Sequence, residues 1–381
     1  MKDNKNKHTL GPKSVTDSSG MSAKKKVLWS LLFVIIAVMS IWAVTSQNAN
    51  FSLSEFGEFL SELNPWWFTA AVAAMLAYVL FEAFSIMLIT KSFGYKQPLR
   101  KGIIYSTSDI YFSAITPSAT GGQPASAYFM THDGIPASIT TVTLFLNLIM
   151  YTFAIIALGI LCFILKPSLF LGFSTFSKVM IVIGCACQVG IALIFMLLLR
   201  KSSWLYKLGD LGLRLLAKLR LIKRLEERRE GLREYIASYE ESVSQLRGKR
   251  KLMAGAFLLN FLQRASLIAV TVFVYLASSG VAGKALDVWV SESMVILGSN
   301  TVPIPGAMGI KDYLLLDAFE AIGLGEDATH LELLSRAVSF YFCVLLCGIS
   351  MVARVVAHKI HVAWLRKHHR KQKNQNNQGE A

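Results

Sequence analysis

The sequence predicts an all-α membrane protein that crosses the bilayer several times. Of its 381 residues, 54% are hydrophobic and 17% are charged. Several apolar runs reach about 20 residues, the length that a helix needs to cross a bilayer. Two shorter runs are broken by proline and glycine, at residues 116–124 and 301–309. We therefore expect about six full transmembrane helices and two re-entrant hairpins of broken helix, which together form an inverted repeat.

The chain begins with a polar segment, residues 1–26, which we expect to be a disordered cytoplasmic N-terminus. Three lysines, at positions 24 to 26, directly precede the apolar run 27–44. A signal peptide is one interpretation of this run. Its length and the lack of a small-residue cleavage site favour a retained first span, with the N-terminus in the cytoplasm.

The first membrane half, residues 27–199, contains three further spans, which we predict at 66–90, 137–165 and 179–199. Two short apolar runs and the first break separate the first two of these. Proline and glycine stop a continuous helix at the break. Irregular backbone at membrane depth must be buried in protein or line a cavity. We therefore predict a re-entrant hairpin over residues 102–131 that opens to the cytoplasm.

Residues 200–251 form a large polar region that is rich in lysine and arginine. Leucines recur at helical spacing over residues 205–219, and residues 226–246 are also amphipathic. We expect a cytoplasmic helical hairpin whose basic face contacts the anionic lipid surface. A connector that only fixes the orientation of the chain is the alternative.

The second membrane half, residues 252–357, contains predicted spans at 252–277 and 333–357. A re-entrant hairpin over residues 285–322 lies between them and opens to the outside. The tail, 358–381, is basic and is expected in the cytoplasm. With both termini and the long basic region inside, the charge distribution of this multi-pass protein follows the positive-inside rule.

The composition argues against several classes of protein. The net charge of +15 collects beside predicted spans, so we expect a membrane surface and no nucleic acid as its partner. The five cysteines lie within apolar runs, where they act as small packing residues. We expect neither a metal nor a cofactor, and we find no catalytic motif in a credible context. A transporter is therefore favoured over an enzyme, and a homo-oligomer stays open.

Charged residues inside the membrane are the first candidates for a site, because each costs about 2.5–3.5 kcal/mol to insert. Arg264 lies near the middle of a span, and its guanidinium can hold a phosphate with two parallel hydrogen bonds. The alternative is an ion pair with Glu82, Asp109 or Asp312. Asp109 and Asp312 flank the two breaks and are candidates for counter-charges, proton carriers or parts of a headgroup site.

The two breaks supply the other candidates. Backbone N–H groups beside glycines near helix ends suit an anionic headgroup, and close helix packing is the alternative. For Arg336 the alternative is a side chain that extends to the membrane interface. The other residues that we assign to a substrate site are Thr116, Pro117, Gly121, Gly122, Gln123, Pro303, Pro305, Gly306, Gly309 and Arg336.

Residues 115–124 and 302–312 together resemble the motifs of the lysylphosphatidylglycerol synthase/flippase transmembrane-domain family, in the form found in Gram-positive bacteria. Arg336, followed by an aromatic-rich span, is similar to the arginine near the start of a late helix in that family. The resemblance covers roughly residues 27–357. The second motif departs from the family at two positions, since the family usually has glycine where Ala307 stands and glutamate where Asp312 stands.

The resemblance implies a lipid-translocating module in a bacterial inner membrane. The best-known members move aminoacylated phosphatidylglycerol to the outer leaflet, which lowers negative surface charge and confers resistance to cationic antimicrobial peptides. Those proteins also carry a soluble domain that transfers lysine from lysyl-tRNA to the lipid, which we do not expect in this chain. A phosphatidylglycerol lysyltransferase and a membrane scaffold whose basic loop recruits a partner are the alternatives to a flippase.

Overall fold

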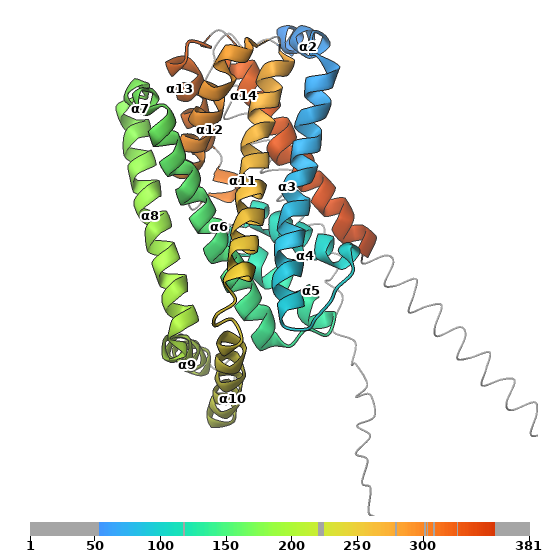
Figure 1. Cartoon of the computed structure of the whole chain (residues 1–381), viewed down its shortest axis with the longest axis vertical. Coiled ribbons are helices and arrows are strands. Elements are labelled where there is room, and N and C mark those ends of the chain that lie inside the picture. The colour runs from blue at the N-terminus through green and yellow to red at the C-terminus, as the bar shows by residue number, and fades with distance from the viewer. Residues whose placement is uncertain are drawn as a thin grey trace, which may run out of the picture.

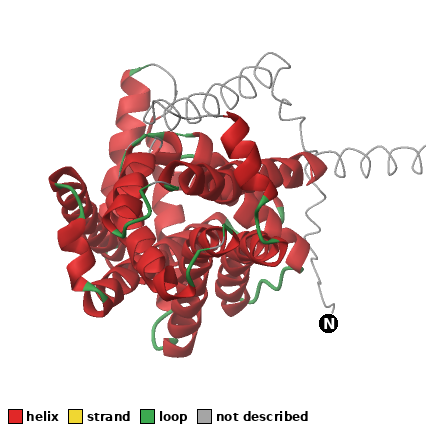
Figure 2. Cartoon of the chain, turned by 90° about the horizontal axis from the view of Figure 1, so that it is seen from above, coloured by secondary structure: helices red, strands yellow, loops and turns green. Residues whose placement is uncertain are grey.

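The computed structural model describes residues 53–354 apart from short gaps at 117–118, 220–224, 279, 301, 303, 308 and 326. Every regular element in this part of the chain is helical, and the long helices form one bundle (Figures 1 and 2). Five helices are long and apolar enough to cross a membrane. The chain is therefore an all-α polytopic membrane protein, as predicted. The predicted first span lies outside the described residues.

The five long helices coincide in sequence with the remaining predicted spans. They are α3 (Pro65–Ser92), α6 (Ala137–Leu165), α8 (Thr175–Arg200), α11 (Arg250–Ala277) and the run Ala328–Arg354, which begins as α14 (Ala328–Arg336). The most extensive packing is between α3 and α11, which lie side by side along the bundle (Figure 1).

The start of α3 shows how the sequence sets a helix end. Pro65 occupies the first turn, where a helix tolerates proline because that position needs no N–H. The Asn64 side chain accepts hydrogen bonds from the N–H groups of Trp66 and Trp67. The Asn64 N–H donates to the carbonyl of Ala277 at 2.8 Å, so this end of α3 lies beside the end of α11.

The first broken pair consists of α4 (Leu99–Ile115) and α5 (Gly122–His132). With 17 and 11 residues, the two helices are about 25 and 17 Å long, shorter than a bilayer core of about 30 Å. They pack against each other and begin and end at the same end of the bundle (Figure 1). This is the geometry of a helical hairpin, at the position that the sequence predicts.

The second broken pair consists of α12 (Ala285–Ser299) and α13 (Ile310–Ala321), with a short 3₁₀ turn, η3 (Pro305–Ala307), between them. These helices also pack against each other, and they lie at the opposite end of the bundle from α4 and α5 (Figure 1). The tip of the first pair meets the second break, because α4 contacts η3. The depth of both pairs in a bilayer stays a prediction.

The polar region 200–251 contains two helices, α9 (Ser202–Lys218) and α10 (Leu225–Ser244). Arg229 of α10 donates to Asp210 of α9 at 2.6 Å, and this hydrogen bond holds the pKa of that carboxyl below its usual range. The hydroxyl of Tyr239 donates to the carbonyl of Leu198 at 3.1 Å, which ties α10 to the end of α8.

The last span differs from its prediction. It begins at Ala328, five residues before the predicted start at 333, because Leu331 and Leu334 are buried and the first turns pack in the core. A π-helical turn, η4 (Ala337–Phe342), then interrupts the span. Such turns are rare and are frequent at functional sites. Three short helices were not predicted: α2 (Leu53–Ser61), α7 (Pro167–Gly172) and η2 (Ala282–Lys284).

Candidate functional site

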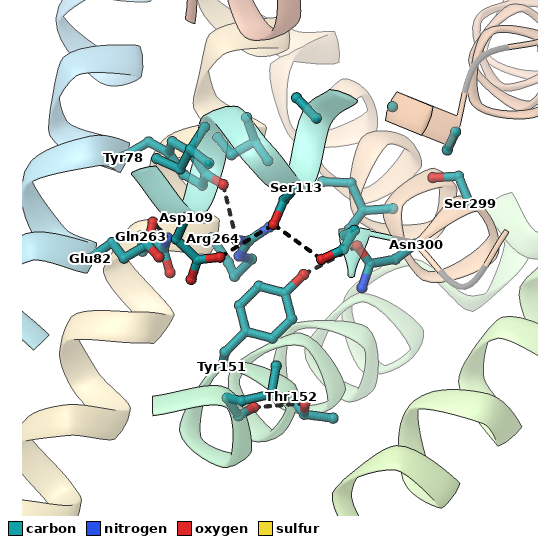
Figure 3. Close-up of a pocket in the computed structure, with 18 of the residues that line it drawn as sticks. Tyr78, Glu82, Asp109, Ser113, Tyr151, Thr152, Gln263, Arg264, Ser299 and Asn300 are labelled. Atoms are coloured by element: carbon teal, nitrogen blue, oxygen red, sulfur yellow. Dashed lines mark hydrogen bonds between the residues drawn. The ribbon is translucent and has the colours of Figure 1, made fainter. Parts of the chain in front are cut away.

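A cavity of about 630 Å³ lies where the two breaks meet. Its walls come from α3, α4, α5, α6, α8, α11 and α12, from the second break and the start of α13, and from the span that contains Arg336. Figure 3 shows the polar side chains that point into it from opposite walls. The volume falls within the range of pockets that bind small ligands or headgroups.

Arg264 of α11 is 6% exposed and lies in the cavity wall. Its guanidinium packs on two aromatic rings, with its central carbon 4.1 Å from the ring centre of Tyr151 and 5.1 Å from that of Tyr78. One terminal nitrogen donates to the hydroxyl of Tyr78 at 3.2 Å (Figure 3). The Nε atom has no hydrogen-bond partner, and no carboxylate within the described residues forms an ion pair with this arginine.

The predicted charge partners of Arg264 bind other groups. Glu82 accepts hydrogen bonds from Ser106 at 3.2 Å and from the amide of Gln263 at 3.1 Å. Its carboxyl is in hydrogen-bonding contact with that of Asp109. Both carboxyl groups are buried and lie together on one side of the cavity (Figure 3).

Asp109 links the two arms of the first hairpin. It accepts hydrogen bonds from Ser113 at 3.2 Å and from the amide of Gln123 at 2.9 Å. The helices can approach this closely because Gly122 has no side chain. A Cβ atom there would lie 2.0 Å from both Asp109 Oδ1 and Ser113 Oγ. At the break itself, the Thr116 hydroxyl accepts from the N–H of Gly121 at 2.9 Å.

The second break is held by a buried ion pair. Asp312 Oδ1 lies 3.0 Å from Arg336 Nε, and the two residues are 0% and 4% exposed. Arg336 also donates to the carbonyl of Gly306 at 3.0 Å, and Asp312 accepts from the N–H of Gly309 at 2.8 Å. Arg336 is therefore locked inside the protein, and the interpretation that it extends to the membrane interface is wrong.

Glycine is needed at this break for conformational reasons. Gly306 and Gly309 have φ values of 62° and 77°, in the left-handed region that side chains disfavour. A Cβ atom on Gly306 would also lie 2.6 Å from the ring of Phe340. Ala307, where the resembling family usually has glycine, adopts φ 51° in spite of its side chain.

The structure places some of the predicted site residues in the cavity wall and others outside it. Asp109, Gln123, Arg264, Gly306 and Arg336 line the cavity. Thr116, Gly121, Gly122, Gly309 and Asp312 shape the two breaks without lining it. Pro117 and Pro303 lie outside the described residues, and Pro305 opens the η3 turn.

Three charged residues near the site were missed in the sequence. Lys311 lines the cavity and pairs with the buried carboxylate of Glu292 at 3.1 Å. Glu332 is 1% exposed and contacts the carboxyl of Asp312. Glu292 lies within an apolar run, so the rule that singled out Arg264 would have identified it.

The described residues contain no cluster of histidine, cysteine, aspartate and glutamate that could hold a metal ion. The histidines beyond residue 354 lie outside that part of the chain.

The cavity wall contains three buried polar atoms that have no hydrogen-bond partner among the described residues. Arg264 Nε is a donor without a partner, and Gln123 Oε1 and Gln263 Oε1 are acceptors without one. A buried polar atom without a partner costs about 1–3 kcal/mol, so a ligand that satisfies all three is bound favourably. A phosphate supplies the acceptor, and an ammonium group supplies the donors.

The comparisons with known proteins agree with this architecture. A family model described as the lysylphosphatidylglycerol synthase TM region matches residues 27–347. Among curated proteins, none matches the chain. The family match includes both broken helix pairs and every residue named above as lining the cavity. The chain therefore belongs to the lysylphosphatidylglycerol synthase transmembrane family.

Proposed function

We propose that this protein is a lipid flippase-like transporter of a bacterial inner membrane. It moves a phospholipid between leaflets, and aminoacylated phosphatidylglycerol or a related lipid is the candidate that family membership favours. Movement of such a lipid to the outer leaflet would lower negative surface charge and so contribute to resistance to cationic antimicrobial peptides. Both termini and the α9–α10 region lie in the cytoplasm in this proposal, as the distribution of lysine and arginine favours.

The observation that carries the proposal is that Arg264 is buried and forms no ion pair with any residue that the structure describes. A buried charge is expensive unless a partner compensates it. The other two cations of the cavity wall, Lys311 and Arg336, already have carboxylate partners. Arg264 is thus suited to take the phosphate of a lipid headgroup, with its planar guanidinium held between two tyrosine rings.

The two hairpins support the translocation step. They enter the bundle from opposite ends and meet at the cavity (Figure 1). In transporters with inverted repeats, the binding site lies at the repeat interface, and the repeats rock around it to open the site to either side. In this proposal, the site at Arg264 opens to the cytoplasm past the first hairpin and, in the alternate state, to the outside past the second hairpin.

Leaflet exchange in liposomes tests the proposal. Purified protein is reconstituted with acyl-chain-labelled phosphatidylglycerol or lysylphosphatidylglycerol in one leaflet. We expect exchange above protein-free liposomes. The Arg264→Gln variant should exchange the lipid at least about tenfold more slowly, because charged hydrogen bonds of about 1.5–3 kcal/mol are lost.

The matched control is Arg200→Gln, which removes an exposed arginine at the end of α8. Unchanged exchange in the Arg264→Gln variant, or an equal loss in the control, would remove Arg264 from the mechanism. Lipid extracts of expressing cells distinguish the alternative, because only a transferase produces a new lipid.

A further inference from the structure

A second group in the cavity wall has no role yet in the proposed function: the buried carboxyl pair of Glu82 and Asp109. The two carboxyl groups are 5% and 7% exposed and are in hydrogen-bonding contact. Two carboxyl groups in such contact cannot both be ionised at low cost, so one of them carries a proton that both share. The pair therefore has one negative charge in its resting form.

The charges of the cavity wall balance when the pair holds one proton. Lys311 is neutralised by Glu292. Asp312 and Glu332 are also two buried carboxyl groups in contact, so they share one negative charge, which Arg336 neutralises. Among the described residues that line the cavity, the remaining charges are the one positive charge of Arg264 and the one negative charge of the carboxyl pair. The site as a whole is then neutral, which is the state that a buried environment favours.

The other titratable groups that face the pair do not change this balance. They are Tyr78 on α3, Tyr151 on α6 and Cys343 in the last span. Phenols and thiols are neutral near pH 7. The partners contributed by α4, α5 and α11 are hydroxyl and amide groups, apart from Arg264 itself.

We infer that the Glu82–Asp109 pair is a proton-exchange site that keeps the cavity neutral when a charged headgroup binds. This inference rests on the proposed function. A headgroup with one net positive charge displaces the shared proton to solvent, and its ammonium group takes the place of that proton between two carboxylates. A headgroup with one net negative charge brings one proton from solvent onto the pair, and a headgroup without net charge moves none.

The unpartnered acceptors support the exchange. Gln263 donates its amide N–H to Glu82, and Gln123 donates its amide N–H to Asp109. The oxygen atoms of both amides are buried and have no hydrogen-bond partner within the described part of the chain. An ammonium group beside the carboxyl pair can donate to these oxygens as well as to the carboxylates, whereas a bare proton cannot. The ammonium group of the lipid and the proton thus compete for one position between the two carboxylates. The exchange drives an aminoacylated lipid toward the more acidic side of the membrane.

Proton counting on binding tests the inference directly. Purified full-length protein in weakly buffered micelles is titrated with phosphatidylglycerol, phosphatidylethanolamine and lysylphosphatidylglycerol, while a pH dye reports the proton change. We expect one proton taken up, none, and one released per lipid bound. As the pH increases, the dissociation constant of phosphatidylglycerol should rise about tenfold per pH unit, because its binding takes up a proton. That of phosphatidylethanolamine should stay constant. That of lysylphosphatidylglycerol should fall about tenfold per pH unit, because its binding releases a proton.

Glu82→Gln and Asp109→Asn should each abolish the proton release with lysylphosphatidylglycerol, since the remaining carboxylate has no shared proton to give. The infrared band of protonated carboxyl groups should be weaker in either variant than in the unaltered ligand-free protein, and the part that remains belongs to the second buried pair, Asp312 and Glu332. The matched control, Glu320→Gln, removes an exposed carboxylate of α13 and should keep both signals.

The outcomes separate the two proposals. If all three lipids bind with the same proton change, or with none, the exchange site is wrong while the flippase proposal stands. If none of the lipids binds and none is exchanged in liposomes, the flippase proposal fails, and the proton-exchange site fails with it.

Discussion

Gly122 shows at the scale of one residue how the sequence permits the first hairpin. Its Cα lies so close to α4 that an added Cβ would stand 2.5 Å from the carbonyl oxygen of Asp109, which is backbone and cannot rotate away. The hydrogen bond from Gln123 to Asp109, which joins the arms, depends on this approach. Close helix packing and the polar contacts at the break are thus two consequences of one glycine. The two interpretations of this glycine, close packing and part of a headgroup site, therefore do not exclude each other.

We expect Gly122→Ala to lower stability by about 1–3 kcal/mol, because the arms must separate to admit the methyl group. The midpoint of thermal unfolding in detergent measures this loss. The matched control is Gly190→Ala in α8, where an added Cβ meets nothing within 4 Å. The control should be neutral or stabilised by up to about 1 kcal/mol, as alanine favours a helix over glycine. Equal midpoints for both variants would contradict the close approach.

At the scale of elements, one buried ion pair stabilises the turn of the second break. Arg336 holds the turn through the carbonyl of Gly306, and Asp312 holds the start of α13 through the N–H of Gly309. Both side chains are buried, so each charge depends on the other. The aspartate that replaces the glutamate usual in the family therefore still reaches its arginine, at 3.0 Å.

Arg336→Gln should cost about 3–5 kcal/mol, because it leaves the Asp312 carboxylate buried without a partner. Asp312→Asn in the same background should recover part of that loss, which a double-mutant cycle of unfolding midpoints measures. The pair of Lys166 and Asp287 is the control, since its side chains are 39% and 20% exposed. Asp287→Asn should cost less than about 1 kcal/mol. A similar small cost for Arg336→Gln would show that the break does not depend on the pair.

The α9 helix has an apolar face that the described part of the chain leaves exposed. Gly209 and Asp210 face α10, where they meet Leu232 and Arg229. The exposed large side chains recur three or four residues apart: Trp204, Leu208, Leu211, Leu215 and Leu219. The basic residues Lys207, Arg214 and Lys218 lie along one flank of this face. A helix of this kind suits the surface of an anionic membrane.

We expect an environment-sensitive fluorophore at position 211 to report an apolar surrounding in vesicles that contain phosphatidylglycerol. The label is attached to a cysteine in a variant whose five native cysteines are replaced. The shift should weaken in neutral vesicles, since the basic flank then has no anionic partner. A label at the exposed position 230 of α10 is the control and should report water in both. Equal spectra at the two positions would show that α9 does not contact the membrane.

At the scale of the whole molecule, the sequence was informative where one chemical property decides the structure. A long apolar run predicts a span, so the predicted ranges of the long helices α3, α6, α8 and α11 agree closely with the structure. The prediction that Arg264 lies in a functional cavity rested on the cost of a buried charge and proposed no particular contact.

The pairing of side chains could not be predicted in the same way. The ion pairs of Arg336 with Asp312 and of Lys311 with Glu292 join helices whose mutual rotation depends on the whole packing. Glu82 was a candidate partner of Arg264, but it lies against Asp109, because α3 and α4 bring the two carboxyl groups together. The partner of a buried charged side chain therefore depends on how the whole bundle is assembled.

The opposite orientation of the two hairpins makes a prediction about the whole molecule in its membrane. Val281 follows α11 at the end of the bundle where Asn64 and Ala277 meet, and it is 69% exposed. Thr131 lies in the last turn of α5 at the other end of the bundle, near the contact of Asp133 with Arg354. Two variants without native cysteines, Val281→Cys and Thr131→Cys, should therefore react with a thiol reagent from opposite sides of the membrane.

In intact cells, a membrane-impermeant maleimide should label Val281→Cys and leave Thr131→Cys unlabelled until the membrane is permeabilised. The exposed Trp66, at the same end as Val281, and the exposed Arg228 in α10 supply one control position for each side. The expectation follows from the positive-inside rule, because the α9–α10 region is rich in lysine and arginine. Labelling of both test positions in intact cells would place the two hairpins on the same side. It would remove the inverted arrangement on which the proposed alternating access to Arg264 depends.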